Sequence, residues 1–137
     1  MVPVSCSDHA FIKEGRFCYS LSGLEVPELT ITSQVNQLSG KPVGAAIEID
    51  PAEFDDEKCK KPLNKYKKYM IVGGRVHPGE SNSSFIVQGF IKFITGQSPE
   101  AISMRKRIIF KVIPMTNPDG VIAGNYRTSL SGNDLNR

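Results

Sequence analysis

The sequence predicts an α/β fold in which a partial mixed β-sheet is flanked by helices. Two short apolar segments, residues 69–72 and 107–113, have the composition of buried strands. Between them, residues 84–95 carry isoleucine and phenylalanine side chains at helical spacing. A strand, a helix and a strand at this spacing form a βαβ unit, so we expect two parallel strands joined by a right-handed crossover.

The segment before this unit predicts two further strands. We expect residues 1–15 to be irregular. Residues 17–21 and 29–32 are rich in aromatic or β-branched side chains, which favour strands. Ser22 and Gly23 favour a turn after the first of them, so the two segments form a hairpin or a pair of neighbouring strands.

Other parts of the chain are predicted to be less regular. Glycine and proline interrupt residues 34–64, within which 45–49 could form a short strand. Residues 99–105 could hold a helical turn. Residues 114–120 contain Asn-Pro-Asp-Gly, a turn sequence. This loop follows the second parallel strand. We therefore expect it to lie beside the carboxyl end of the strand at 69–72.

The composition indicates one globular domain or a piece of a larger one. The chain has 137 residues, of which 39% are hydrophobic and 23% charged, as in soluble proteins. No apolar run approaches the roughly 20 residues that span a bilayer, and the N-terminus lacks the features of a signal peptide. Cys6, Cys18 and Cys59 are an odd, widely spaced set, which favours free thiols. We therefore expect a cytoplasmic protein without a membrane partner.

The positive charge of the chain is concentrated in one segment. The net charge is +3, and six lysines lie within residues 58–68. A solvated loop explains such a cluster better than attraction to an acidic partner does. No aromatic residues alternate with these charges in a recognisable module, so we expect no nucleic-acid partner.

A histidine and a glutamate lie at the corner between the first parallel strand and the helix. His77 and Glu80 are three residues apart, and a tight turn places such residues on one side, where both could meet one cation. Pro78 and Gly79 between them suit a sharp corner. By itself this spacing is weak, since a surface histidine beside a glutamate is commoner. The position favours a ligand site, because open α/β sheets bind ligands at the carboxyl ends of their strands.

Several motifs in a fixed order resemble one enzyme family. The strings RVHPGESNSSF and FKVIPMTNPDGVIAGNYRTSLSGNDLNR resemble the zinc metallocarboxypeptidases, and among them the cytosolic carboxypeptidases, which include tubulin deglutamylases. The string CYSLSGLEVPELTIT is similar to the strand pair that opens their catalytic domain. The resemblance runs from about Phe17 to Arg137. It identifies residues 1–137 as the N-terminal portion of such a catalytic domain, truncated, with an insertion loop at 34–64.

The resemblance implies a zinc site. His77 and Glu80 would be two of its three protein ligands, and Asp134 would orient the histidine. This set suits zinc, which takes imidazole nitrogen and carboxylate oxygen and keeps an open position for water in catalytic sites. A carboxylate on the second ring nitrogen fixes the tautomer of a ligating histidine.

The resemblance also implies a substrate site. Arg127 would polarise the scissile carbonyl, while Asn136 and Arg137 would hold the terminal carboxylate of the substrate. A planar guanidinium can bind both oxygens of a carboxylate. Taken one at a time, these residues could equally be surface arginines and a turn. The ordered set of motifs favours the functional interpretation.

The expected activity is hydrolysis of C-terminal residues, with glutamate in the tails of proteins such as tubulin as the expected substrate. In this family zinc-bound water attacks the terminal peptide bond. The third ligand and the general base lie beyond the Asn-Arg pair, and the other histidine of this chain, His9, matches nothing in the motif. We therefore expect the 137-residue chain to be inactive by itself. The alternative is a module that binds acidic C-terminal tails without cleaving them.

Overall fold

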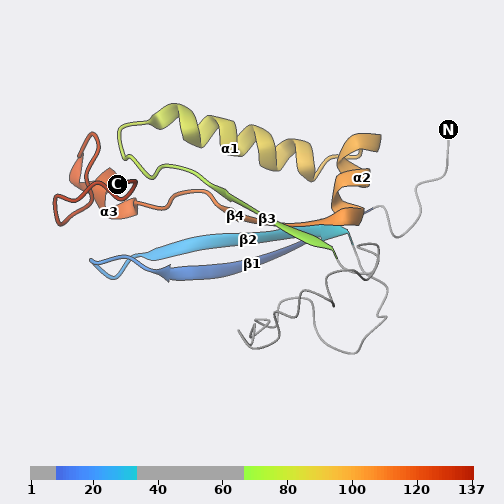
Figure 1. The fold of residues 1–137 in the computed structure, drawn as a ribbon, viewed down its shortest axis with the longest axis horizontal. Coiled ribbons are helices and arrows are strands. Elements are labelled where there is room, and N and C mark those ends of the chain that lie inside the picture. Colours follow the sequence, from blue (N-terminus) through green and yellow to red (C-terminus); the bar gives the residue numbers. More distant parts are fainter. Residues whose placement is uncertain (1–8, 34–66) are drawn as a thin grey trace, which may run out of the picture.

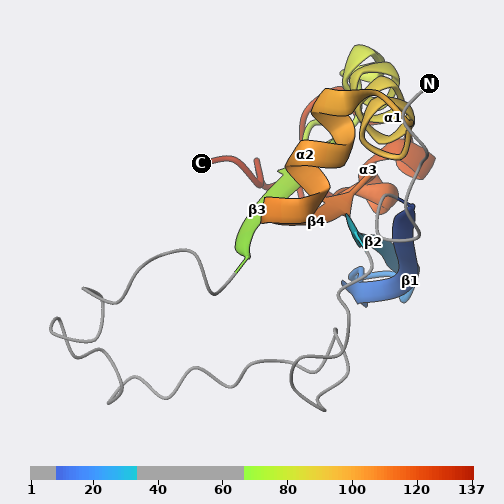
Figure 2. The same cartoon turned by 90° about the vertical axis from the view of Figure 1, so that its right-hand side faces the viewer.

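The computed structural model describes residues 9–33 and 67–137, and within them a mixed sheet is covered by helices on one face (Figures 1 and 2). Seven elements follow one another along the chain: β1 (Ala10–Tyr19), β2 (Glu25–Ser33), β3 (Lys68–Gly73), α1 (Ser81–Ile94), α2 (Pro99–Arg107), β4 (Ile108–Ile113) and α3 (Pro118–Ala123). This arrangement confirms the predicted fold class.

The sheet has the strand order β1-β2-β4-β3. β3 and β4 are parallel and in register from Lys68 opposite Ile108 to Gly73 opposite Ile113. The other two pairings are antiparallel. The βαβ prediction is confirmed, and the carboxyl ends of both parallel strands lie at the same end of the sheet.

The N-terminal hairpin is longer than its sequence pattern predicts. The expectation of an irregular segment up to residue 15 is wrong from Ala10 onward, because β1 pairs with β2 along its length. A register shift between Arg16 and Cys18 marks a bulge. The middle of β1 is polar, with Lys13, Glu14 and Arg16 around Gly15, so the partner strand and not the local pattern determines its length. Gly23 has φ 85° in the turn, as glycine permits.

Two further predictions differ from the structure, and a third concerns residues that the structure does not describe. The strand at 69–72 was expected to be buried, yet Tyr69, Met70 and Ile71 are exposed, since β3 is an edge strand of the described sheet. The turn after β4 includes the short helix α3, because Asn117 caps it: its side chain accepts from the N–H of Gly120. The expected insertion at 34–64, with the strand at 45–49, lies outside the described residues.

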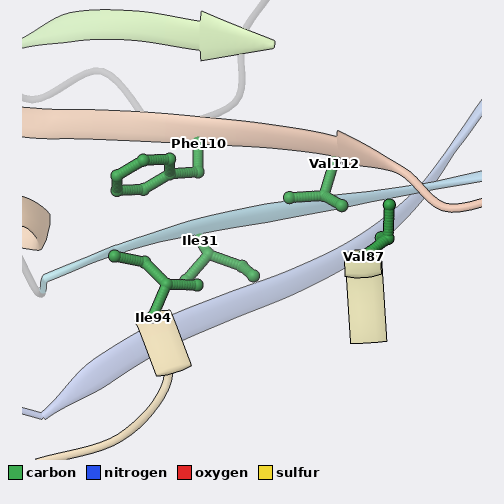
Figure 3. Close-up of a cluster of buried hydrophobic side chains, with 5 residues drawn as sticks. All are labelled: Ile31, Val87, Ile94, Phe110 and Val112. Carbon is green, nitrogen blue, oxygen red and sulfur yellow. The ribbon is translucent and has the colours of Figure 1, made fainter. Parts of the chain in front are cut away.

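The core forms between α1 and the sheet (Figure 3). Val87 and Ile94 of α1 meet Ile31, Phe110 and Val112 of the two central strands. The ring of Phe90 on α1 packs edge-to-face on that of Phe110, with centroids 5.6 Å apart. These contacts fix α1 over the strands and hence fix where its N-terminus lies. Among the helices of the described residues, none has the length and apolar character needed to cross a membrane.

Candidate active site

The candidate site lies where β3 and β4 end. Beyond the strands the two segments remain hydrogen-bonded, because the Gly74 N–H donates to the carbonyl of Ile113 at 2.9 Å and the Gly74 carbonyl accepts from the Thr116 N–H at 2.9 Å. A Cβ at Gly74 would lie 2.8 Å from the Pro114 carbonyl oxygen, so the close approach requires glycine. The start of α1, α3 and the C-terminal segment gather at this end of the sheet (Figure 1).

His77 is buried between two carboxylates. Its side chain is 7% exposed; Nδ1 lies 3.0 Å from Glu80 Oε1, and Nε2 lies 3.1 Å from Asp134 Oδ1. A neutral imidazole has one N–H, so it can donate to only one of these oxygens. At the other contact two lone pairs would face each other across about 3 Å. A neutral ring therefore donates at one contact and presents a lone pair at the other.

Asp134 joins the histidine to the rest of the site. Its carboxylate accepts from the backbone N–H of Asn136 at 2.9 Å and from Arg127 Nε at 2.7 Å, in addition to its contact with His77. The Asn136 N–H, followed by the His77 and Arg127 side chains, lowers the pKa of Asp134 to about 2. The group is therefore an anion at neutral pH and can accept a hydrogen bond from His77 Nε2.

The predicted substrate residues differ in how closely they approach the histidine. Arg127, with a side chain 40% exposed, shares the Asp134 carboxylate with His77. Asn136 and Arg137 are exposed, and Arg137 donates from Nη1 to the Asn136 carbonyl at 3.1 Å. The structure thus brings His77, Glu80, Asp134 and Arg127 together. It places Asn136 and Arg137 beside this group, on the chain that leads away from Asp134.

Two glycines allow the C-terminal segment to approach the corner. Gly79 N–H donates to the carbonyl of Tyr126 at 2.7 Å, and a Cβ there would lie 2.5 Å from the Tyr126 ring. A Cβ at Gly120 would lie 2.3 Å from Pro78 Cγ and 2.7 Å from the Thr128 carbonyl oxygen. The chain that carries Arg127 and Asp134 therefore packs directly on the turn that carries His77.

Sequence reasoning missed two residues that support the site. Asn117 is buried, and its Nδ2 donates to the Val76 carbonyl at 3.1 Å, just before His77. Asp119 accepts from the hydroxyls of Ser22 and Ser20, which lower its pKa in that order and connect the hairpin to α3. Both residues belong to the Asn-Pro-Asp-Gly string. A turn is a sufficient explanation of that string, so the sequence gives no reason to expect contacts with distant residues. An asparagine before Pro-Asp-Gly is also a helix N-cap signal.

The corner supplies two donors of the kinds that zinc binds. The imidazole of His77 and the carboxylate of Glu80 are ligands that zinc takes, and their facing atoms lie 3.0 Å apart. Asp134 occupies Nε2, which leaves Nδ1 to face Glu80, as expected for a ligating histidine with a carboxylate behind it. In residues 9–33 and 67–137, no group of three or more His, Cys, Asp or Glu side chains could hold a metal ion.

Comparison with known sequences points to one family. The zinc carboxypeptidase family pattern matches residues 14–137. The chain is 46% identical over 127 residues to cytosolic carboxypeptidase 2 of Mus musculus, over 93% of this chain and 12% of the mouse protein. It is 54% identical over 78 residues to cytosolic carboxypeptidase 3 of Bos taurus, over 57% of this chain and 8% of the bovine protein. The chain therefore spans only a small part of the length of these relatives.

Comparison with solved structures agrees. A metallo-carboxypeptidase from Burkholderia cenocepacia matches with a TM-score of 0.64 and 25% identity, over 91% of this chain and 27% of that chain. A metallo-carboxypeptidase from Pseudomonas aeruginosa matches with a TM-score of 0.60 and 20% identity, over 90% of this chain and 26% of that chain. The second match concerns the fold alone.

Proposed function

The chain belongs to the zinc carboxypeptidase family, and we propose that it supplies the His77–Glu80 part of the active site of a zinc-dependent carboxypeptidase. The enzyme would remove C-terminal amino acids from peptides or protein tails. One observation supports this most strongly: the buried His77 ring has a carboxylate oxygen at about 3 Å from each of its nitrogens. One such contact suits an N–H donor, and the other suits a shared cation.

His77 and Glu80 would hold the zinc ion through Nδ1 and a carboxylate oxygen. When bound, zinc supplies an activated water and polarises the scissile carbonyl. Asp134 accepts the Nε2–H of His77, so that the lone pair of Nδ1 stays directed at the metal position. Because hydrogen bonds keep Asp134 ionised at neutral pH, its carboxylate would remain available to accept from that N–H.

Arg127 and the Asn136–Arg137 pair would act on the substrate. Arg127 is held by its Nε on Asp134, which leaves the outer end of a half-exposed guanidinium to donate to the carbonyl oxygen as negative charge develops on it. Asn136 and Arg137 would bind the terminal carboxylate of the substrate. Asp134 thus fixes both the ligating ring and the oxyanion-stabilising arginine, so that metal and arginine would act on the same carbonyl.

The similar proteins support a proposal for the substrate class and the location. The relatives in mouse and cattle are named cytosolic carboxypeptidases, and we propose a cytosolic location for this protein too. We further propose glutamate as the released residue and acidic tails, such as those of tubulin, as substrates, on the resemblance to the deglutamylating members of this group. Asn136 and Arg137 can supply the donors for the terminal carboxylate.

The proposed function predicts release of the last residue from a peptide with a free carboxylate. The full-length gene product, loaded with zinc, should release glutamate from a glutamate-tailed peptide, as followed by mass spectrometry. A peptide amidated at its C-terminus should remain intact, because no carboxylate is available for the Asn136–Arg137 pair. A chelator should stop release and added zinc should restore it.

The same assay distinguishes the alternative. A protein that binds the acidic peptide in a pull-down but releases no residue, with or without zinc, would be a tail-binding module and not an enzyme. Equal cleavage of the amidated peptide would contradict an exopeptidase. A lysine-tailed peptide of the same length tests the substrate preference separately, since faster release of lysine would contradict the glutamate proposal and leave the carboxypeptidase proposal unaffected.

A further inference from the structure

Arg75 has an unusual backbone conformation two residues before His77. Its φ is 54°, and among the described residues it is the only non-glycine residue with positive φ. This left-handed region is unfavourable for a side chain as long as that of arginine, and such residues persist where surrounding contacts hold them. The position lies in the loop between the end of β3 and the start of α1.

The guanidinium of Arg75 makes those contacts within the same turn. Nε and Nη2 both donate to the Pro78 carbonyl, at 3.0 and 2.7 Å, and Nη1 donates to Ser84 Oγ at 3.0 Å. The backbone N–H of Arg75 donates to Ser83 Oγ at 3.0 Å. The side chain therefore folds back over the turn and joins it to the first turn of α1.

The carbonyls on both sides of His77 are held by side chains. Asn117 holds the Val76 carbonyl at 3.1 Å, and Arg75 holds that of Pro78. The His77 carbonyl itself accepts from Glu80 N–H at 3.2 Å. Pro78 lies between the two proposed ligands, so the orientation of its peptide groups determines how far apart the imidazole and the carboxylate stand.

We propose that Arg75 is a positioning residue for the zinc site, because its guanidinium fixes the Pro78 carbonyl and thereby sets the spacing of His77 and Glu80. This inference rests on the proposed function. None of the recorded hydrogen bonds of Arg75 goes to the side chain of His77, Glu80 or Asp134, so its effect passes through the backbone. The left-handed conformation of Arg75 lets its side chain lie over the turn that follows it and reach the Pro78 carbonyl.

Zinc affinity of the full-length gene product tests this inference. Arg75→Gly removes the guanidinium but suits the left-handed backbone. Arg75→Lys keeps the charge but cannot make two parallel bonds to one carbonyl. Arg107→Lys is the matched control, since Arg107 lies at the end of α2 and donates to Ser103 at 3.2 Å. Affinity is measured by competition with a chelator, at a temperature where each variant is folded by circular dichroism.

We expect zinc affinity to fall about 10- to 100-fold in Arg75→Gly, as for other residues that orient metal ligands, and by less in Arg75→Lys. Arg107→Lys should match the wild type. With saturating zinc, kcat should fall while KM for the peptide stays unchanged. If the folded Arg75 variants bind zinc as tightly as the wild type, the inference about Arg75 is wrong and the proposed function still stands. If the wild-type protein binds no zinc, both the inference and the proposed function are wrong. Should Arg75→Gly not fold, Arg75→Lys decides by the same criterion.

Discussion

Replacement of His77 by alanine is expected to abolish zinc-dependent peptidase activity of the full-length gene product. His77 is the only imidazole at the corner, and in the proposed site it would supply the sole nitrogen ligand among the described residues. Enzymes accelerate their reactions by at least about 10⁶-fold, and loss of the metal removes both the activated water and the polarised carbonyl. We therefore expect kcat/KM to fall by at least about 10³-fold. Stoichiometric zinc binding should be lost as well.

His9→Ala is the matched control for this prediction. It removes the other histidine of the chain, which is exposed and lies just before β1. Its activity and zinc content should equal those of the wild type. Zinc content is measured on the dialysed protein by mass spectrometry of the metal. A His77→Ala protein that keeps one tightly bound zinc and its activity would show that the metal binds elsewhere.

Replacement of Arg127 by alanine is expected to lower kcat by about 10²- to 10³-fold, the usual effect of removing one donor to a developing oxyanion. Arg127 also donates to Asp134 at 2.7 Å, so the loss should weaken zinc binding slightly as well. Arg127→Lys restores a positive charge without the planar fork and should recover only part of the rate. The measurement is steady-state kinetics at saturating zinc.

Arg16→Ala serves as the control for a general charge effect. Arg16 lies on the hairpin, where it pairs with Glu25 at 2.9 Å, and its removal should leave the kinetics unchanged. If Arg127→Ala lost affinity for the peptide but kept the wild-type kcat, Arg127 would bind the substrate without stabilising the transition state. The role that we assign to it would then be wrong.

The features that could be predicted from the sequence are those encoded over short stretches. The apolar runs at 69–72 and 107–113 and the helical spacing between them determine the βαβ unit. This unit in turn places His77 and Glu80 at the carboxyl edge of the sheet. A separation of three residues in a tight turn is enough to bring their side chains together, because the geometry is local.

The features that could not be predicted depend on partners distant in the sequence. The exposure of Tyr69 and Ile71 follows from the position of β3 at the edge of the described sheet, which no local pattern encodes. The conformation of Arg75 also has no signal, since an arginine rarely adopts positive φ. From the sequence, Asp134 is expected only to orient the histidine. Its further bonds to Arg127 and to Asn136 N–H required the folded C-terminal segment.

The most direct test of the account is the location of the metal. Crystals of the zinc-loaded full-length gene product, measured on both sides of the zinc absorption edge, give an anomalous difference map that identifies zinc and its position. We predict a peak within bonding distance of His77 Nδ1 and a Glu80 carboxylate oxygen, with Asp134 still bonded to His77 Nε2. A peak at Nε2, or one remote from both side chains, would contradict the assignment of this corner as the metal-binding part of the active site.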